Sequence, residues 1–154
     1  MGSIRDEIKQ TRPFASLAEE AVVTLLGTAD RVRSALSLVV DAHGITLQQY
    51  NVLRILRGAP EGLPCGEIGN RMITRDPDIT RLLDRIEKRR LISRNRHDQD
   101  RRVVLTRITG EGLALLERLD EPVLDLHRRL FGHLGTERLE MLRQLLEECR
   151  TAAG

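Results

Sequence analysis

The chain has 154 residues, 40% of them hydrophobic and 31% charged, a composition typical of one folded domain rather than of a disordered or fibrous protein. The chain contains no run of about 18 apolar residues and its first residues are polar, so we expect no membrane span or secretory signal and place the protein in the cytoplasm. The net charge is +2, and Cys65 and Cys149 have no partner Cys or His at metal-ligand spacing, which argues against a disulfide framework or a zinc site.

The first part of the chain predicts two helices. From about Phe14 to Ala42, apolar residues recur every three or four positions, which is the spacing of one buried helix face. Either Ser16 or Pro13 can open this helix. Gly44 follows this segment and tolerates the left-handed conformation that commonly ends a helix. Thr46 and Gln49 have the spacing of a capping box, so a second helix is expected to begin there and to stop before residues 58–62.

The next segment predicts a helix-turn-helix. Residues 63–72 fit a short third helix with Cys65 near its start. Asp76 and Pro77 mark the start of a fourth, because Asp caps free amides and Pro loses no needed hydrogen bond at the first helical position. We expect this helix to run to about Arg90. Two helices separated by a turn of a few residues are the sequence pattern of a helix-turn-helix.

After the fourth helix the apolar spacing changes to a period of two. Residues 91–94 and 103–108 are expected to form the strands of a small hairpin, joined by a polar segment. A long helix is then expected from residues 109–112 onward, with a kink near Pro122, followed by a last helix through Leu139 and Leu146. The predicted fold is mainly α (α+β): a winged helix-turn-helix between long N- and C-terminal helices.

Basic residues are concentrated in the middle of the chain. Residues 71–107 contain twelve Lys or Arg and six Asp or Glu, so this segment is far more basic than the rest. Such a distribution fits a module that contacts phosphates. The fourth helix has an apolar stripe and an opposite polar face that includes Thr80, Arg81, Asp84, Arg85 and Lys88. An ordinary solvated helix has the same pattern, but the neighbouring helix and hairpin favour a helix that reads base edges in the major groove.

The hairpin tip is the second candidate contact with DNA. Arg101 and Arg102 lie between two short strands that would project them from the body, where arginine side chains fit a narrow minor groove. Asp98 and Asp100 would repel phosphates unless paired. We therefore expect at least one of them to form a salt bridge with an arginine and to hold the wing in shape. The alternative is a charged surface turn without a partner.

Three stretches together resemble the multiple antibiotic resistance regulator (MarR) family: residues 78–88, residues 91–92 and residues 100–109, the last reading DRRVVLTRIT. The resemblance implies that residues 1–45 and 109–154 form dimerisation helices around a DNA-binding lobe at 46–108, all within one intertwined domain. It also implies that Arg102 reaches the minor groove and that Asp100 braces the wing. The predicted DNA-binding residues are Arg75, Asp78, Thr80, Arg81, Arg85, Lys88, Arg101 and Arg102.

Two features depart from the family pattern. Arg90 occupies the position before Leu91 where the family usually has Gly, so this turn must form without the residue that best accepts positive φ. Members that sense peroxide carry a reactive Cys near the N-terminus, whereas the first Cys here is Cys65. An N-terminal thiol switch is therefore disfavoured, and a buried structural role is favoured for Cys65.

The sequence contains no Gly-rich phosphate loop, nucleophile motif or metal-binding motif, so we expect neither an enzyme nor a bound cofactor or metal. The favoured function is a sequence-specific regulator that binds a pseudo-palindromic duplex operator as a homodimer, acting as a repressor that a small aromatic or anionic effector releases. A constitutive or architectural DNA-binding factor and a helical protein-interaction module remain open as alternatives.

Overall fold

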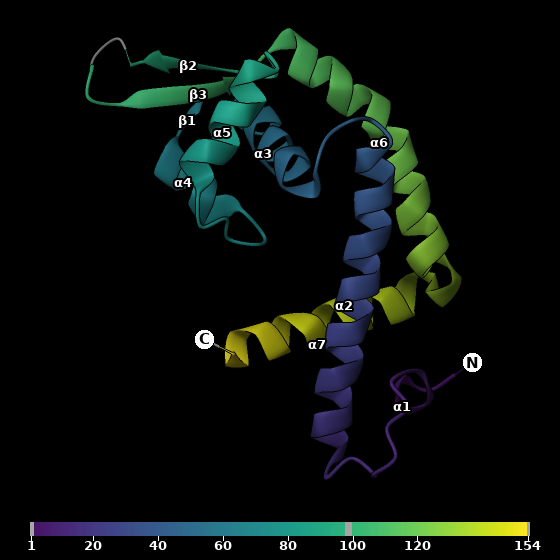
Figure 1. The fold of residues 1–154 in the computed structure, drawn as a ribbon. Coiled ribbons are helices and arrows are strands. Elements are labelled where there is room, and N and C mark those ends of the chain that lie inside the picture. The colour runs from purple at the N-terminus through teal and green to yellow at the C-terminus, as the bar shows by residue number, and fades with distance from the viewer. Residues whose placement is uncertain (1, 98–99, 154) are drawn as a thin grey trace.

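The computed structural model describes residues 2–97 and 100–153, and it is mainly helical with one small sheet (Figure 1). This confirms the predicted fold class. None of the described helices is long and apolar enough to cross a bilayer. The elements in chain order are α1 (Ile4–Glu7), α2 (Leu17–Asp41), α3 (Leu47–Arg57), β1 (Leu63–Pro64), α4 (Cys65–Arg71), α5 (Ile79–Lys88), β2 (Ile92–Arg96), β3 (Val104–Ile108), α6 (Gly110–Phe131), a 3-10 turn (Gly132–Leu134) and α7 (Gly135–Ala152).

The ends of α2 and α3 follow from local capping. Ser16, one of the two expected opening residues, accepts a hydrogen bond from the amide of Glu19 at 3.1 Å, so α2 begins at Leu17. Before α3, the amide of Gln49 donates to Thr46 Oγ1 at 3.3 Å, and the amide of Thr46 donates to Gln49 Oε1 at 3.1 Å. The predicted capping box is therefore confirmed.

The start of α5 differs from the prediction by two residues. Asp78, not Asp76, is the N-cap, and its Oδ1 accepts the amide of Arg81 at 3.1 Å. Asp76 instead accepts the amide of Asp78 at 2.8 Å, which places Pro77 in the turn that precedes the helix. At the other end α5 stops at Lys88, and Arg90 adopts the left-handed conformation with φ of 59°.

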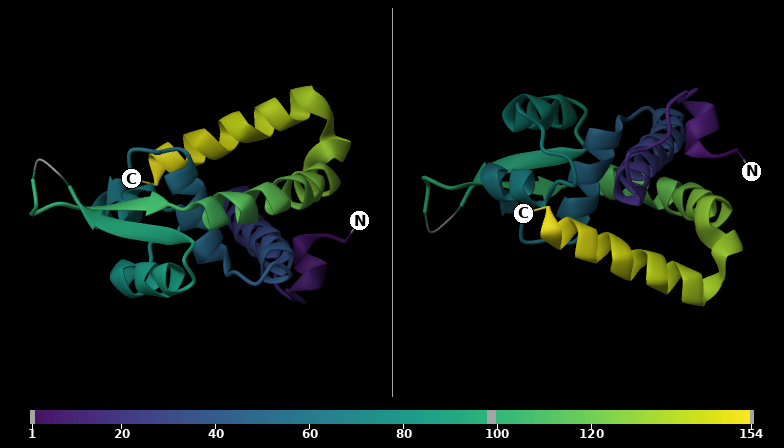
Figure 2. Two further views of the ribbon diagram at one scale, coloured as in Figure 1. Left: turned by 90° about the horizontal axis from the view of Figure 1, so that it is seen from above. Right: turned by 90° about the horizontal axis from the view of Figure 1, so that it is seen from below.

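The sheet has three antiparallel strands in the order β1-β3-β2. The β2–β3 hairpin was predicted, whereas the first two residues of the predicted third helix form β1 and pair with β3. Pro64 cannot donate a ladder hydrogen bond, and it is accommodated because β1 is an edge strand. The resulting hairpin extends away from the helices (Figure 2).

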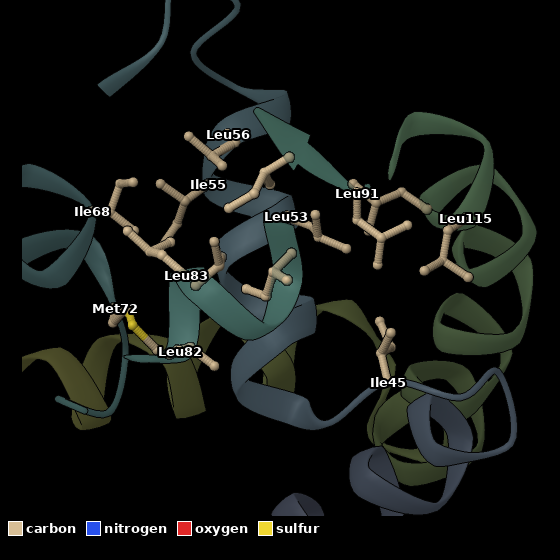
Figure 3. Close-up of a cluster of buried hydrophobic side chains, with 14 of the residues drawn as sticks. Ile45, Leu53, Ile55, Leu56, Ile68, Met72, Leu82, Leu83, Leu91 and Leu115 are labelled. Carbon is tan, nitrogen blue, oxygen red and sulfur yellow. The ribbon is translucent and has the colours of Figure 1, made fainter. Parts of the chain in front are cut away.

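One hydrophobic core joins the parts of the lobe. Leu53 and Leu56 of α3 and Leu83 of α5 lie at its centre, and Figure 3 shows Ile45 and Leu115 at its edge toward α6. The core continues along α6 through Leu116, Leu119 and Val123 and includes Val40 of α2. The first half of α6 is therefore packed as part of the lobe.

Two long helices, α2 and α7, lie largely outside this core. From the end of α6 the chain turns sharply, and α7 runs back across the molecule (Figures 1 and 2). No residue of α7 is buried, and Val40 is the only buried residue of α2. Large apolar side chains are exposed on both helices, among them Leu17, Val22, Leu26, Leu38, Met141 and Leu145.

Candidate nucleic-acid interface

Helix α5 separates a packing face from a polar face. Leu82, Leu83 and Ile86 are buried in the core. The opposite side is exposed to solvent at four of the predicted DNA-binding positions, which are Thr80, Arg81, Arg85 and Lys88. The lobe can therefore hold α5 by one face while the other face stays accessible to a ligand.

The turn before α5 adds two more of the predicted residues. Arg75 is exposed in the loop between α4 and α5. Asp78 caps the helix, and its Oδ2 also lies 3.4 Å from Nε of Arg81. The structure thus gives Asp78 two contacts within α5, both of which fix the first turn on which Arg81 stands.

Cys65 lies at the start of α4, beside this region. It is partly buried against the core, and its Sγ is 4.0 Å from Oγ1 of Thr80. Within the described part of the chain, no three His, Cys, Asp or Glu side chains are grouped so as to hold a metal ion.

The wing carries the remaining two predicted arginines. Arg101 and Arg102 are exposed in the connection between β2 and β3. Among the described residues of this connection, the amide of His97 donates to the carbonyl of Val103 at 2.8 Å, and the amide of Val103 donates to the carbonyl of Asp100 at 3.0 Å. The backbone that carries the two arginines is therefore held at its base.

Asp100 contacts the backbone of this turn. Its Oδ1 accepts the backbone amide of Arg102 at 3.0 Å, and among the described residues its carboxylate makes no ion pair with a guanidinium. An Asp side chain that bonds the amide two residues later is a common turn stabiliser, so the local geometry favours the amide. Asp98, the other candidate for the expected salt bridge, lies outside the described residues.

Sequence reasoning missed one ionic cluster, which joins the wing to α5. The guanidinium of Arg94, on β2, lies 2.5 Å from Asp84 Oδ1 and 2.5 Å from Glu87 Oε2. Its hydrogen bond with Glu87 is the main reason that the pKa of Arg94 lies above its ordinary value. The sequence contained a partial signal, because two acids three positions apart share a helix face, but their partner lies on another element.

The chain is similar to known transcription regulators. The family model described as MarR family matches residues 45–104, which span α3 to the start of β3. The chain is 32% identical over 111 residues to the HTH-type transcriptional regulator FarR of Neisseria gonorrhoeae, covering 71% of this chain and 75% of that protein. It is 27% identical over 130 residues to the homoprotocatechuate degradative operon repressor of Escherichia coli, covering 84% and 87%.

A solved structure supports the same assignment. The crystal structure of a MarR transcription factor from Planctomyces limnophilus is 40% identical, with a TM-score of 0.67, and the match covers 88% of this chain and 98% of that one. The similarity thus includes the terminal helices as well as the lobe. On these grounds the chain belongs to the MarR family of transcription regulators.

Proposed function

We propose that this protein is a sequence-specific transcription regulator that binds duplex DNA as a homodimer and acts as a repressor. The observation that carries the proposal is the exposed basic face of α5 next to a projecting wing with two exposed arginines. An α-helix fits the major groove, and arginine side chains fit the minor groove beside it. The relatives are bacterial proteins, and bacterial DNA lies in the cytoplasm, so we propose that the protein acts there.

Each predicted residue is proposed to have a definite role. Arg81 and Arg85 suit bidentate contacts with guanine, and Thr80 suits a base edge or a thymine methyl group. Lys88 and Arg75, near the two ends of α5, are proposed to contact phosphates. Arg101 and Arg102 are proposed to reach the minor groove, and Asp78 and Asp100 to hold the turns on which Arg81 and Arg102 stand.

The dimer is proposed to form through the terminal helices. The exposed side chains of Leu38, Met141 and Leu145, for example, are 74%, 62% and 53% accessible in the single chain. Exposed apolar side chains concentrated on two long helices mark an interaction surface. A two-fold dimer would present two copies of α5 to successive major grooves about 34 Å apart, which matches a pseudo-palindromic operator.

Release by a small aromatic or anionic effector completes the proposal. An effector lowers DNA affinity only if it binds more tightly to a dimer shape in which the spacing of the two α5 helices no longer fits the grooves. The Escherichia coli relative is a repressor by name, which supports repression. A panel of small aromatic acids that leaves operator affinity unchanged would instead favour the constitutive DNA-binding alternative.

The test begins with the fragments of genomic DNA that the purified protein retains. Fluorescence anisotropy on one such fragment should show affinity falling steeply with salt, and Arg81→Ala and Arg102→Ala should each weaken binding. Lys88→Ala, at a proposed phosphate contact, should reduce the salt slope by about one. Arg54→Ala on α3 is a matched control, since it removes an exposed arginine that lies outside α5, the wing and the proposed dimer helices. A monomer that retains no duplex at low ionic strength would contradict the proposal.

A further inference from the structure

The ionic cluster at Arg94 sets this residue apart from the proposed DNA-contacting arginines. The side chain of Arg94 is 25% exposed, whereas that of Arg81 is 71% exposed. Its guanidinium points back to α5, where Nη2 donates to Oδ1 of Asp84. Oε2 of Glu87 accepts two hydrogen bonds from the same guanidinium, from Nε at 2.9 Å and from Nη2 at 2.5 Å. Arg94 is thus paired with acids of α5, the proposed recognition helix, and is not free to bind a phosphate.

The backbone takes part in the same contact. The amide of Arg94 donates to Oε1 of Glu87 at 3.1 Å, so the two oxygens of one carboxylate hold the main chain and the side chain of a β2 residue. Asp84 adds a second anchor one helical turn earlier. Because Arg94 contacts both acids, these contacts restrain the rotation of the wing relative to α5 as well as the distance between the wing and α5.

We infer that Arg94 is a positioning residue that fixes the angle between the wing and the recognition helix through Asp84 and Glu87. The inference rests on the proposed function, in which α5 and the wing enter two different grooves of one duplex. Both elements must then be oriented correctly at the same time. An orientation that is already set in the free protein avoids an ordering cost on binding.

The effect of removing the charge of Glu87 distinguishes positioning by Arg94 from a direct electrostatic effect on DNA binding. Asp84 and Glu87 put negative charge on the helix that faces DNA, so electrostatics alone predicts that Glu87→Gln strengthens binding. Positioning predicts the opposite, because a neutral amide holds the guanidinium less firmly than a carboxylate does. The sign of the change in affinity therefore distinguishes the two explanations.

The experiment measures the affinity of the full-length dimer for a fragment retained by the wild-type protein, over a range of salt concentrations. Arg94→Met and Glu87→Gln should each weaken binding about tenfold. The double variant should be no weaker than the worse single one, since Arg94→Met already removes the contact that Glu87→Gln weakens. Arg94→Lys keeps the charge but cannot bridge two carboxylates as a fork, so it should also weaken binding. The salt slope of all these variants should equal that of the wild type, because no phosphate contact is lost.

Glu61→Gln is the matched charge control. It removes one exposed acid from the same lobe, where Glu61 lies in the turn before β1, and it should leave binding unchanged or tighter. Tighter binding by Glu87→Gln, additive losses in the double variant, or a slope reduced by one in Arg94→Met would each overturn the inference.

A readout without DNA keeps the inference separate from the proposed function. Hydrogen exchange of the β2–β3 ladder in the free dimer should be faster in Arg94→Met and Glu87→Gln than in the wild type and in Glu61→Gln, because the wing has lost its anchor on α5. Unchanged exchange in both variants would overturn the positioning role even if the wild-type protein bound no duplex. If the wild-type protein binds no duplex but the variants show faster exchange, the proposed function is overturned and the positioning role stands.

Discussion

Replacing Gly112 with Ala should destabilise the protein, although Ala is the better helix former. Gly112 lies in the first turn of α6, where an added Cβ would be 2.3 Å from the carbonyl oxygen of Leu91 and 2.7 Å from Cγ1 of Ile108. Ordinary contact begins near 3.4 Å, so the helix or the carbonyl must move by about 1 Å. The carbonyl is not free to move, since it accepts the amide of Thr109 at 3.1 Å.

The expected magnitude follows from three opposing effects. Helix propensity favours Ala over Gly by about 1 kcal/mol. Overpacking against fixed backbone costs about 1–3 kcal/mol, and weakening the hydrogen bond between Thr109 and Leu91 costs about 1 kcal/mol more. We therefore expect Gly112→Ala to lower the free energy of unfolding by about 2 kcal/mol.

Urea unfolding at one fixed protein concentration measures this change, because the stability of a dimer depends on concentration. The midpoint should fall while the m-value stays constant. Gly110→Ala is the matched control two residues earlier in α6, where an added Cβ meets no atom within 4 Å, and it should raise stability slightly or leave it unchanged. A midpoint for Gly112→Ala equal to or above that of the wild type would refute the steric reasoning.

Two further predictions concern the end of α5 and the dimer. Arg90→Gly should raise the free energy of unfolding by about 0.5–1 kcal/mol, because glycine adopts the left-handed backbone at φ of 59° without strain. Part of this gain is lost because glycine raises the entropy of the unfolded chain. A melting temperature that does not rise would contradict this prediction. Leu145→Glu should convert the dimer to a monomer in sedimentation equilibrium, with Leu145→Ala showing a weaker effect, since a charge on the exposed apolar face of α7 cannot be buried without a partner. A dimer of undiminished affinity in Leu145→Glu would remove α7 from the interface.

The parts of the fold with local sequence signals were predicted well. The Thr46–Gln49 capping box, the hairpin and the apolar face of α5 all depend on residues a few positions apart, and the structure has each of them. β1 was missed because two residues are too short to show a period and because Pro64 disfavours a strand; its pairing with β3 is a long-range contact. The start of α5 was misplaced because Asp76 and Asp78 are both suitable caps, and only the fold decides between them.

The candidate site divides in the same way. The exposure of Arg81 on α5 and of Arg102 in the wing follows from helix and hairpin patterns that the sequence contains. The partner of Asp100 is the backbone amide two residues later, a local contact that the turn pattern allows but does not distinguish from a salt bridge. The partners of Arg94 lie on a different element, so they could not be identified before the elements were packed together. The DNA-binding roles of these residues stay predictions until the binding experiments are made.

The burial of the first half of α6 in the lobe core means that no flexible linker separates the lobe from the second half of this helix. Leu116 and Leu119 pack the helix into the lobe core, and α6 continues without interruption to Phe131. Pro122 lies between these ends and cannot donate the backbone hydrogen bond that a helix of other residues would have there. In the proposed dimer, α6 would therefore transmit a change in lobe orientation, and Pro122 is the position at which this helix bends most easily.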